Sequence, residues 1–173
     1  DTDHIGYSLF QNDAALTRGW VWKSFTRGHH PILMEDSTGF SGWAAGRSAM
    51  GHTQSYASRM NLAGMTPLNN LSSTSYCLAN AGQEYLVYQP GNGPFTVNVA
   101  GGAYAYEWFN PVTGTVAGTG TVGDGARLRA GHGAGLEAAT AQTAYPSRAV
   151  LRRGGRMHWR QADDRPTRHY AAE

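Results

Sequence analysis

Hydrophobic residues near the start of the chain recur with the period of an α-helix. In the stretch DAALTRGWVWKSFTRG, Leu16, Trp20 and Lys23 fall on one helical face. Asp13 before this stretch and Gly28 after it are residue types that favour a helix N-cap and a helix C-cap. The pattern therefore predicts a first helix between these two positions.

A second helical segment follows a short apolar run. Ala49, Thr53, Tyr56 and Met60 recur at helical spacing, which predicts a helix over 46–62. Between the two helices, the run PILM starts with a proline and is followed directly by two acids, which is typical of a short buried strand. With the acids that open the chain, the predicted order is strand end, helix, strand, helix.

After position 67 the pattern changes to the period-two alternation of β-strands. Four short runs, SYCLA, EYLVYQ, PFTVNVA and YAYEWF, are separated by the turn sequences AGQ and PGNG or followed by NPVTG. In the last run Tyr104, Tyr106 and Trp108 share one face, which is more typical of a core than of a binding platform. We predict a small antiparallel β-sandwich over 73–125, joined to the helical region by a linker at 63–72.

Composition favours a globular protein. Of the 173 residues, 40% are hydrophobic and 15% are charged, which argues against wholesale disorder. No apolar run reaches the roughly 18 residues of a membrane span, so we expect no membrane partner. With Cys77 as the single cysteine, an internal disulfide is excluded.

Charge is distributed unevenly along the chain. Residues 1–125 carry five bases and eight acids, a net charge of −3, whereas residues 126–173 carry nine arginines and four acids, a net charge of +5. The basic residues of this tail have no regular spacing, so we expect no nucleic-acid partner. Loss of alternation predicts an irregular, disordered tail over 126–173. Its Arg, Ala and Gly content would also fit a non-native terminus, read in a shifted frame of GC-rich DNA from about Ala126.

Several strings within residues 1–122 resemble the apiosidase-like glycoside hydrolases. They are DTDHI, WVWKSFTRGHHPILM, SYCLANAGQEYLVYQPG and EWFNPVTG. In that family a (β/α)8 barrel is followed by a β-sandwich that carries the name collagen-binding domain. The resemblance implies an α+β fragment in which residues 1–62 are the last βα units of a TIM barrel. Six and a half preceding units would then belong to a missing N-terminal barrel segment of the same protein.

The resemblance also implies a catalytic site at the strand tips. Retaining glycosidases use two carboxyl groups about 5–5.5 Å apart, one as nucleophile and one as acid/base. Asp3 matches the nucleophile position, where the family usually has Glu, and Asp1 is the next candidate. His4 would orient the carboxylate by a hydrogen bond. At the tip of strand eight, Glu35 and Asp36 would bind sugar hydroxyls.

Aromatic and histidine residues near these acids leave two further questions. Trp43 follows in a glycine-rich segment, where an exposed ring would stack on a sugar and a buried ring would serve packing. His4, His29 and His30 lack the spacing and the supporting carboxylates of a zinc site, so we expect no metal and no cofactor.

Two functions follow from this sequence. The first is the C-terminal fragment of an extracellular or periplasmic glycoside hydrolase-like protein whose substrate is a polysaccharide or oligosaccharide. Hydrolysis would require the second acid from the missing barrel segment, so the fragment would be inactive alone. The second is a non-catalytic β-sandwich module that binds carbohydrate or matrix. An in-frame barrel with an acid on strand four, encoded upstream, would favour the first.

Overall fold

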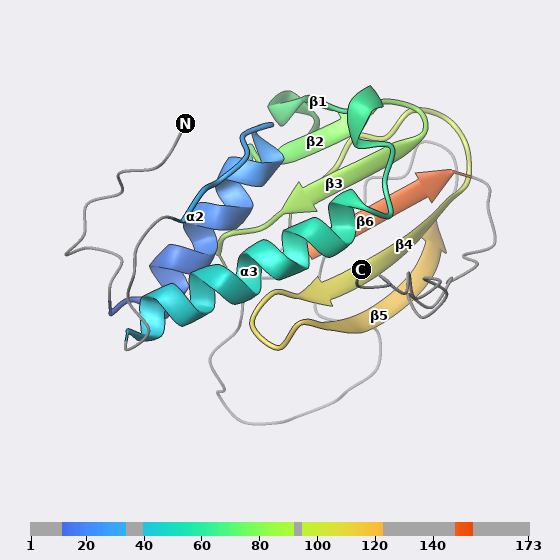
Figure 1. Ribbon diagram of the computed structural model, residues 1–173. Coiled ribbons are helices and arrows are strands. Elements are labelled where there is room, and N and C mark those ends of the chain that lie inside the picture. The colour runs from blue at the N-terminus through green and yellow to red at the C-terminus, as the bar shows by residue number, and fades with distance from the viewer. Residues whose placement is uncertain (1–11, 34–39, 92–94, 123–147, 154–173) are drawn as a thin grey trace, which may run out of the picture.

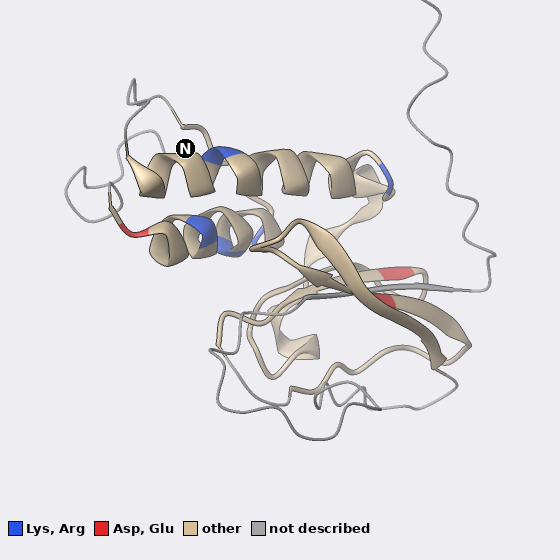
Figure 2. Ribbon diagram, turned by 90° about the horizontal axis from the view of Figure 1, so that it is seen from below, with Lys and Arg blue, Asp and Glu red and all other residues tan. Residues whose placement is uncertain are grey.

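The protein folds as two layers in a computed structural model that describes residues 12–33, 40–91, 95–122 and 148–153. Helices α2 (Ala14–Thr26) and α3 (Ser41–Ala57) lie side by side on one face of a six-stranded antiparallel sheet (Figure 1). Figure 2 shows the helical layer and the sheet from the side. The predicted α+β class is confirmed.

The strands of the sheet follow the order β1-β2-β3-β6-β4-β5. Their bounds are β1 (Thr66–Pro67), β2 (Cys77–Asn80), β3 (Glu84–Tyr88), β4 (Tyr104–Asn110), β5 (Thr115–Val122) and β6 (Arg148–Arg153). Two 3-10 turns, η1 (Leu62–Gly64) and η2 (Asn69–Leu71), flank β1. Because β6 pairs with both β3 and β4, a segment from far along the chain occupies the centre of the sheet.

The predicted N-cap of α2, Asp13, is confirmed, and its C-cap is Arg27, one residue before the predicted Gly28. The Asp13 carboxylate accepts a hydrogen bond of 2.8 Å from a backbone N–H of the first turn. At the other end, the N–H groups of Gly28 and His29 donate to the carbonyls of Phe25 and Ser24, each at 3.0 Å. This is a Schellman motif, and Gly28 adopts the positive φ of 78° that such a motif requires.

Helix α3 begins five residues before the predicted start, within the glycine-rich segment, and it ends at Ala57 instead of residue 62. Gly42 and Gly46 are buried in its first half. A Cβ atom on Gly46 would lie only 2.9 Å from Cγ2 of Thr17 in α2, so the missing side chain lets the two helices approach closely. Ala49, Thr53, Tyr56 and Met60, whose spacing predicted this helix, are all buried, although Met60 lies beyond its end.

A hydrophobic core fills the space between the helices and the sheet. Strand β3 shows the alternation that creates it, because Leu86 and Tyr88 face the helices whereas Tyr85 and Val87 face the opposite side. The residues of this helix-facing core are Val21, Trp22, Phe25, Ala49, Tyr56, Met60, Met65, Leu78, Leu86, Tyr88 and Phe109. The helical region and the strand region, predicted as separate domains, therefore share one core.

A second core lies on the other face of the sheet. It contains Cys77, Ala79, Tyr85, Val87, Phe95, Val97 and Tyr104. Tyr106 and Trp108 pack against it, which confirms the predicted core role of the aromatic face of β4. The run around Phe95 and Val97 covers this face but contributes only an isolated bridge, between Ser72 and Val97, within the described residues. The described strands therefore form one sheet instead of two facing sheets.

Two other predicted elements differ from the structure. Residues 31–33 of the predicted strand eight have no regular structure, and the rest of that run lies outside the described residues. The prediction of an irregular tail is wrong for residues 148–153, which form β6. In the register of β6, Arg152 is paired with Glu84 of β3. The other residues after 125 lie outside the described part.

The close approach of the two helices predicts opposite effects for two Gly-to-Ala substitutions in α3. Gly51 has open space around its Cβ position, so Gly51→Ala should stabilise the fold by about 0.5–1 kcal/mol through helix propensity. Gly46→Ala should destabilise it by about 1–3 kcal/mol, because Thr17 is fully buried and its hydroxyl is held by the Asp13 carbonyl at 2.9 Å. Denaturant unfolding measures both, and equal stability of the two variants would contradict close packing at Gly46.

Candidate functional site

Most of the sequence-predicted site residues fall in parts of the chain that the structure does not describe. Asp1, Asp3, His4, Glu35 and Asp36 lie outside the described residues. Their roles as nucleophile, orienting group and sugar ligands therefore stay predictions.

Trp43 is the sequence-predicted site residue that the structure places. It lies in the first turns of α3 instead of a glycine-rich loop, and its side chain is fully buried. A buried indole presents no ring face to a sugar, so the placement in an exposed loop is corrected and packing is the role observed.

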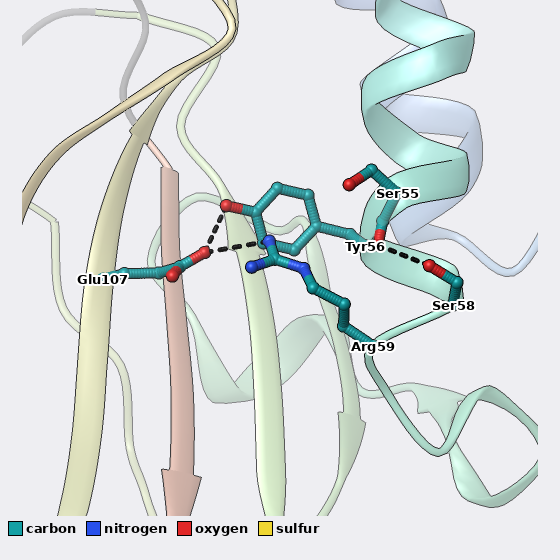
Figure 3. Close-up of polar contacts among 5 residues, drawn as sticks. All are labelled: Ser55, Tyr56, Ser58, Arg59 and Glu107. Carbon is teal, nitrogen blue, oxygen red and sulfur yellow. Dashed lines mark hydrogen bonds and ion pairs between the residues drawn. The ribbon is translucent and has the colours of Figure 1, made fainter. Parts of the chain in front are cut away.

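The most developed polar network of the described residues joins the end of α3 to β4 (Figure 3). The Tyr56 hydroxyl donates a hydrogen bond to Oε1 of Glu107, and Nη2 of Arg59 donates to the same oxygen at 3.1 Å. The Arg59 guanidinium also lies 4.0 Å from the centre of the Tyr56 ring. Glu107 is only 1% exposed, so its carboxylate is held inside the protein by these two donors.

Local sequence explains how these groups meet. Glu107 and Phe109 alternate with the aromatic residues of β4 that face the other core, which turns the carboxylate toward the helices. Helix α3 ends at Ser58, whose hydroxyl donates to the Ser55 carbonyl at 2.9 Å. This ending directs the next residue, Arg59, back toward the sheet (Figure 3).

A second buried carboxylate binds the same segment of chain. Glu84 of β3 is 8% exposed, and its Oε1 accepts a hydrogen bond of 2.8 Å from the backbone N–H of Asn61. Together, Glu84 and Glu107 hold the six residues from Tyr56 to Asn61 against the sheet.

The chemistry of this network is that of an anchor. An acid that acts on a glycosidic bond must reach the substrate oxygen or the anomeric carbon, whereas both carboxylates are buried under α3. Neither Glu107 nor Arg59 was among the functional residues predicted from the sequence. The available signal was a lone acid in the otherwise aromatic run YAYEWF, since such an acid needs a partner if its face is buried.

Cations and tyrosines meet at the C-terminal end of α2. Nζ of Lys23 lies 5.7 Å, and Cζ of Arg27 lies 4.6 Å, from the centre of the Tyr76 ring. The Tyr76 ring in turn contacts that of Tyr88, with centres 6.1 Å apart. Burial raises the pKa of Tyr88 to about 12, while the positive charge of Arg18 acts to lower it.

Cys77 lies in the far-side core and is fully buried. Burial raises the pKa of its thiol to about 12, because the thiolate would lose its solvation there. A thiol that keeps its proton is a poor nucleophile, so Cys77 has a packing role.

The chain matches no family model and no curated protein. The resemblance to apiosidase-like hydrolases therefore stays a prediction from the quoted strings. Within the described ranges, no three His, Cys, Asp or Glu residues gather as a metal site. No helix of those ranges is long and apolar enough to cross a membrane.

The anchoring role of Glu107 predicts a large stability loss when its side chain is removed. Glu107→Ala should destabilise the fold by about 2–3 kcal/mol, because the buried Tyr56 hydroxyl and the Arg59 charge lose their shared acceptor. Ser55→Ala, on the exposed side of α3, is the control and should change the free energy of unfolding by no more than about 0.5 kcal/mol. Similar denaturation midpoints for the two variants would contradict the anchor.

The raised pKa of Cys77 predicts slow alkylation in the native state. At about pH 8, iodoacetamide should react roughly a thousandfold more slowly than in denaturant, because burial both excludes the reagent and suppresses the thiolate. Since the unfolded thiol ionises near 9.0 and the native one near 12, this group should also lower the free energy of unfolding as pH rises between those values. Mass spectrometry of the alkylated fraction measures the rate, and fast labelling of folded protein would contradict the burial.

Proposed function

We propose that this chain is the C-terminal part of a glycoside hydrolase-like protein that acts on polysaccharide outside the cell. In this proposal the described residues form a non-catalytic module that supports the barrel. The helices α2 and α3 would be its last two barrel helices, and the sheet would be the domain that follows the barrel.

One observation carries this proposal: the strings that resemble the family meet at a single side chain. Trp22 belongs to WVWKSFTRGHHPILM, Tyr88 to SYCLANAGQEYLVYQPG and Phe109 to EWFNPVTG. The Trp22 ring stacks on that of Tyr88 with centres 6.3 Å apart and meets the edge of Phe109 at 6.0 Å. Residues far apart in the sequence that share a fully buried indole support a docked helix and sheet pair.

Catalysis would belong to the intact protein. The Asp3 carboxylate would attack the anomeric carbon, while an acid from strand four of the missing barrel segment protonates the leaving oxygen. Water would then hydrolyse the glycosyl-enzyme, with the same acid acting as base. One carboxylate cannot perform both steps, so the chain alone lacks half of this machinery.

A second candidate function is a non-catalytic module that binds carbohydrate or matrix. The observation that favours it is that both buried acids make structural hydrogen bonds. Glu107 binds the end of α3, and Glu84 binds the segment that follows it. Neither of these carboxylates is offered to a sugar. Under this candidate, a longer protein encoded by the same region would not hydrolyse glycosidic bonds.

We predict that the chain alone turns over no aryl-glycoside or plant polysaccharide, whereas a protein extended upstream in frame through the barrel does. Asp3→Asn in the longer protein should lower kcat by at least roughly a thousandfold through loss of the nucleophile. Asp13→Asn is the matched control and should keep activity, because Asn caps a helix as well as Asp.

Two outcomes of this assay would count against the proposal. If the chain alone shows turnover that disappears with Asp3→Asn, the prediction that it is inactive is wrong. A longer protein that binds glycan without hydrolysing it would overturn the enzyme and support the second candidate.

A further inference from the structure

The last turn of α2 carries positive charge that no described acid neutralises. Lys23 and Arg27 both contact the ring of Tyr76, and we call these three residues the Tyr76 patch. Of the three described acids, Asp13 caps the opposite end of α2, and Glu84 and Glu107 are buried beneath α3. In Figure 2 the blue segments of α2 lie apart from the red segments in the sheet.

The patch is held in place by the elements on both sides of it. Arg27 is the C-cap of α2, and the Schellman motif fixes the turn that follows. Gly28 in that turn packs against β1, since a Cβ atom there would lie 3.0 Å from Cγ of Pro67. Tyr76 directly precedes β2, and its ring is braced by Tyr88. A cation held in this way loses little conformational freedom when it binds a ligand.

Two cations on one aromatic ring also repel each other. Both charges lie within 6 Å of the same ring centre, so their separation is at most about 10 Å, which is comparable with the Debye length at 0.1 M salt. The positive charge of Arg18, which acts on the neighbouring Tyr88, adds to this field. An anion at the patch would relieve the repulsion, and the exposed fork of Arg27 matches a carboxylate in a bidentate geometry.

We propose that the Tyr76 patch binds an acidic polysaccharide through the carboxylates of its uronate residues. The choice of a glycan rests on the proposed function, and the choice of an acidic one rests on the charge of the patch. A polymer with one carboxylate on each sugar presents repeated anions to Arg27 and Lys23, while Arg18 contributes to its attraction. The site therefore selects charged over neutral polysaccharide.

The test uses the full chain and polygalacturonate as the probe, with the fully methyl-esterified polymer as a neutral match. Affinity electrophoresis should show binding of the acidic polymer that weakens with added salt. Arg27→Gln and, separately, Lys23→Gln should each weaken it roughly three- to tenfold. Arg47→Gln removes an exposed arginine from α3 and should stay within about twofold of the wild type. Circular dichroism checks that each variant is folded.

Each contrary result separates this inference from the proposed function. Two results would show that the Tyr76 patch is not the binding site for the acidic polymer. One is an equal loss of affinity for Arg27→Gln and Arg47→Gln, and the other is equally tight binding of the esterified and the acidic polymer. Neither would alter the expected hydrolysis by the longer protein, which is measured independently. A DNA oligonucleotide that binds as tightly and with the same dependence on Arg27 would show a general polyanion site and overturn the acidic glycan as its ligand.

Discussion

The indole of Trp22 has no exposed surface and meets four other aromatic rings, from α2, α3, β3 and β4. A tryptophan buries up to about 250 Å² on folding, so this one side chain contributes several kcal/mol at about 25 cal/mol for each Å². The ring centres of these neighbours lie 6.0–6.4 Å from that of Trp22; they belong to Phe25, Tyr56, Tyr88 and Phe109. Tyr56 and Phe109 also contact each other, with ring centres 5.1 Å apart. The position of the helical layer on the sheet therefore depends on the rotation of α2 that turns Trp22 inward.

Apolar contacts alone leave such a layer free to slide, because they have little directional preference. The two buried carboxylates supply direction. Glu107 fixes the last turn of α3 through Tyr56 and Arg59, and Glu84 fixes the next turn of chain through Asn61. Since these bonds come from two different strands, β4 and β3, the end of α3 is located across the sheet as well as along it.

Local signals in the sequence predicted the helical layer well. Asp13 and Gly28 were sufficient to place the ends of α2 to within a residue, and the spacing of Ala49, Thr53 and Tyr56 was sufficient to find the buried face of α3. The start of α3 was missed because the glycine-rich segment before residue 46 is typical of a loop, and the nearness of α2 at Gly46 is not visible in the sequence. Close approach between elements is a tertiary property, and local pattern does not contain it.

The sheet and the polar groups were less predictable for the same reason. Strand β5 is composed of Thr, Gly, Ala and Val and β6 is rich in arginine, so neither shows a clear alternation, and pairing with other strands decides both. Glu107 lies about 50 residues from its partners Tyr56 and Arg59 in the sequence, so no local motif contains all three. For the candidate catalytic acids, a resemblance supplied the roles, and residues 1–11 lie outside the described structure.

The central position of β6 affects how far the sheet can fold while the chain is being synthesised. Strand β6 lies between β3 and β4 and joins the two halves of the sheet. These halves can therefore be joined only after residue 153 has been synthesised. Until then a nascent chain carries two unpaired inner edges, which are templates for pairing with other chains. Ribosomal synthesis would therefore leave this sheet open from the time β4 emerges until β6 follows it, and chaperones that cover strand edges would matter most during that interval.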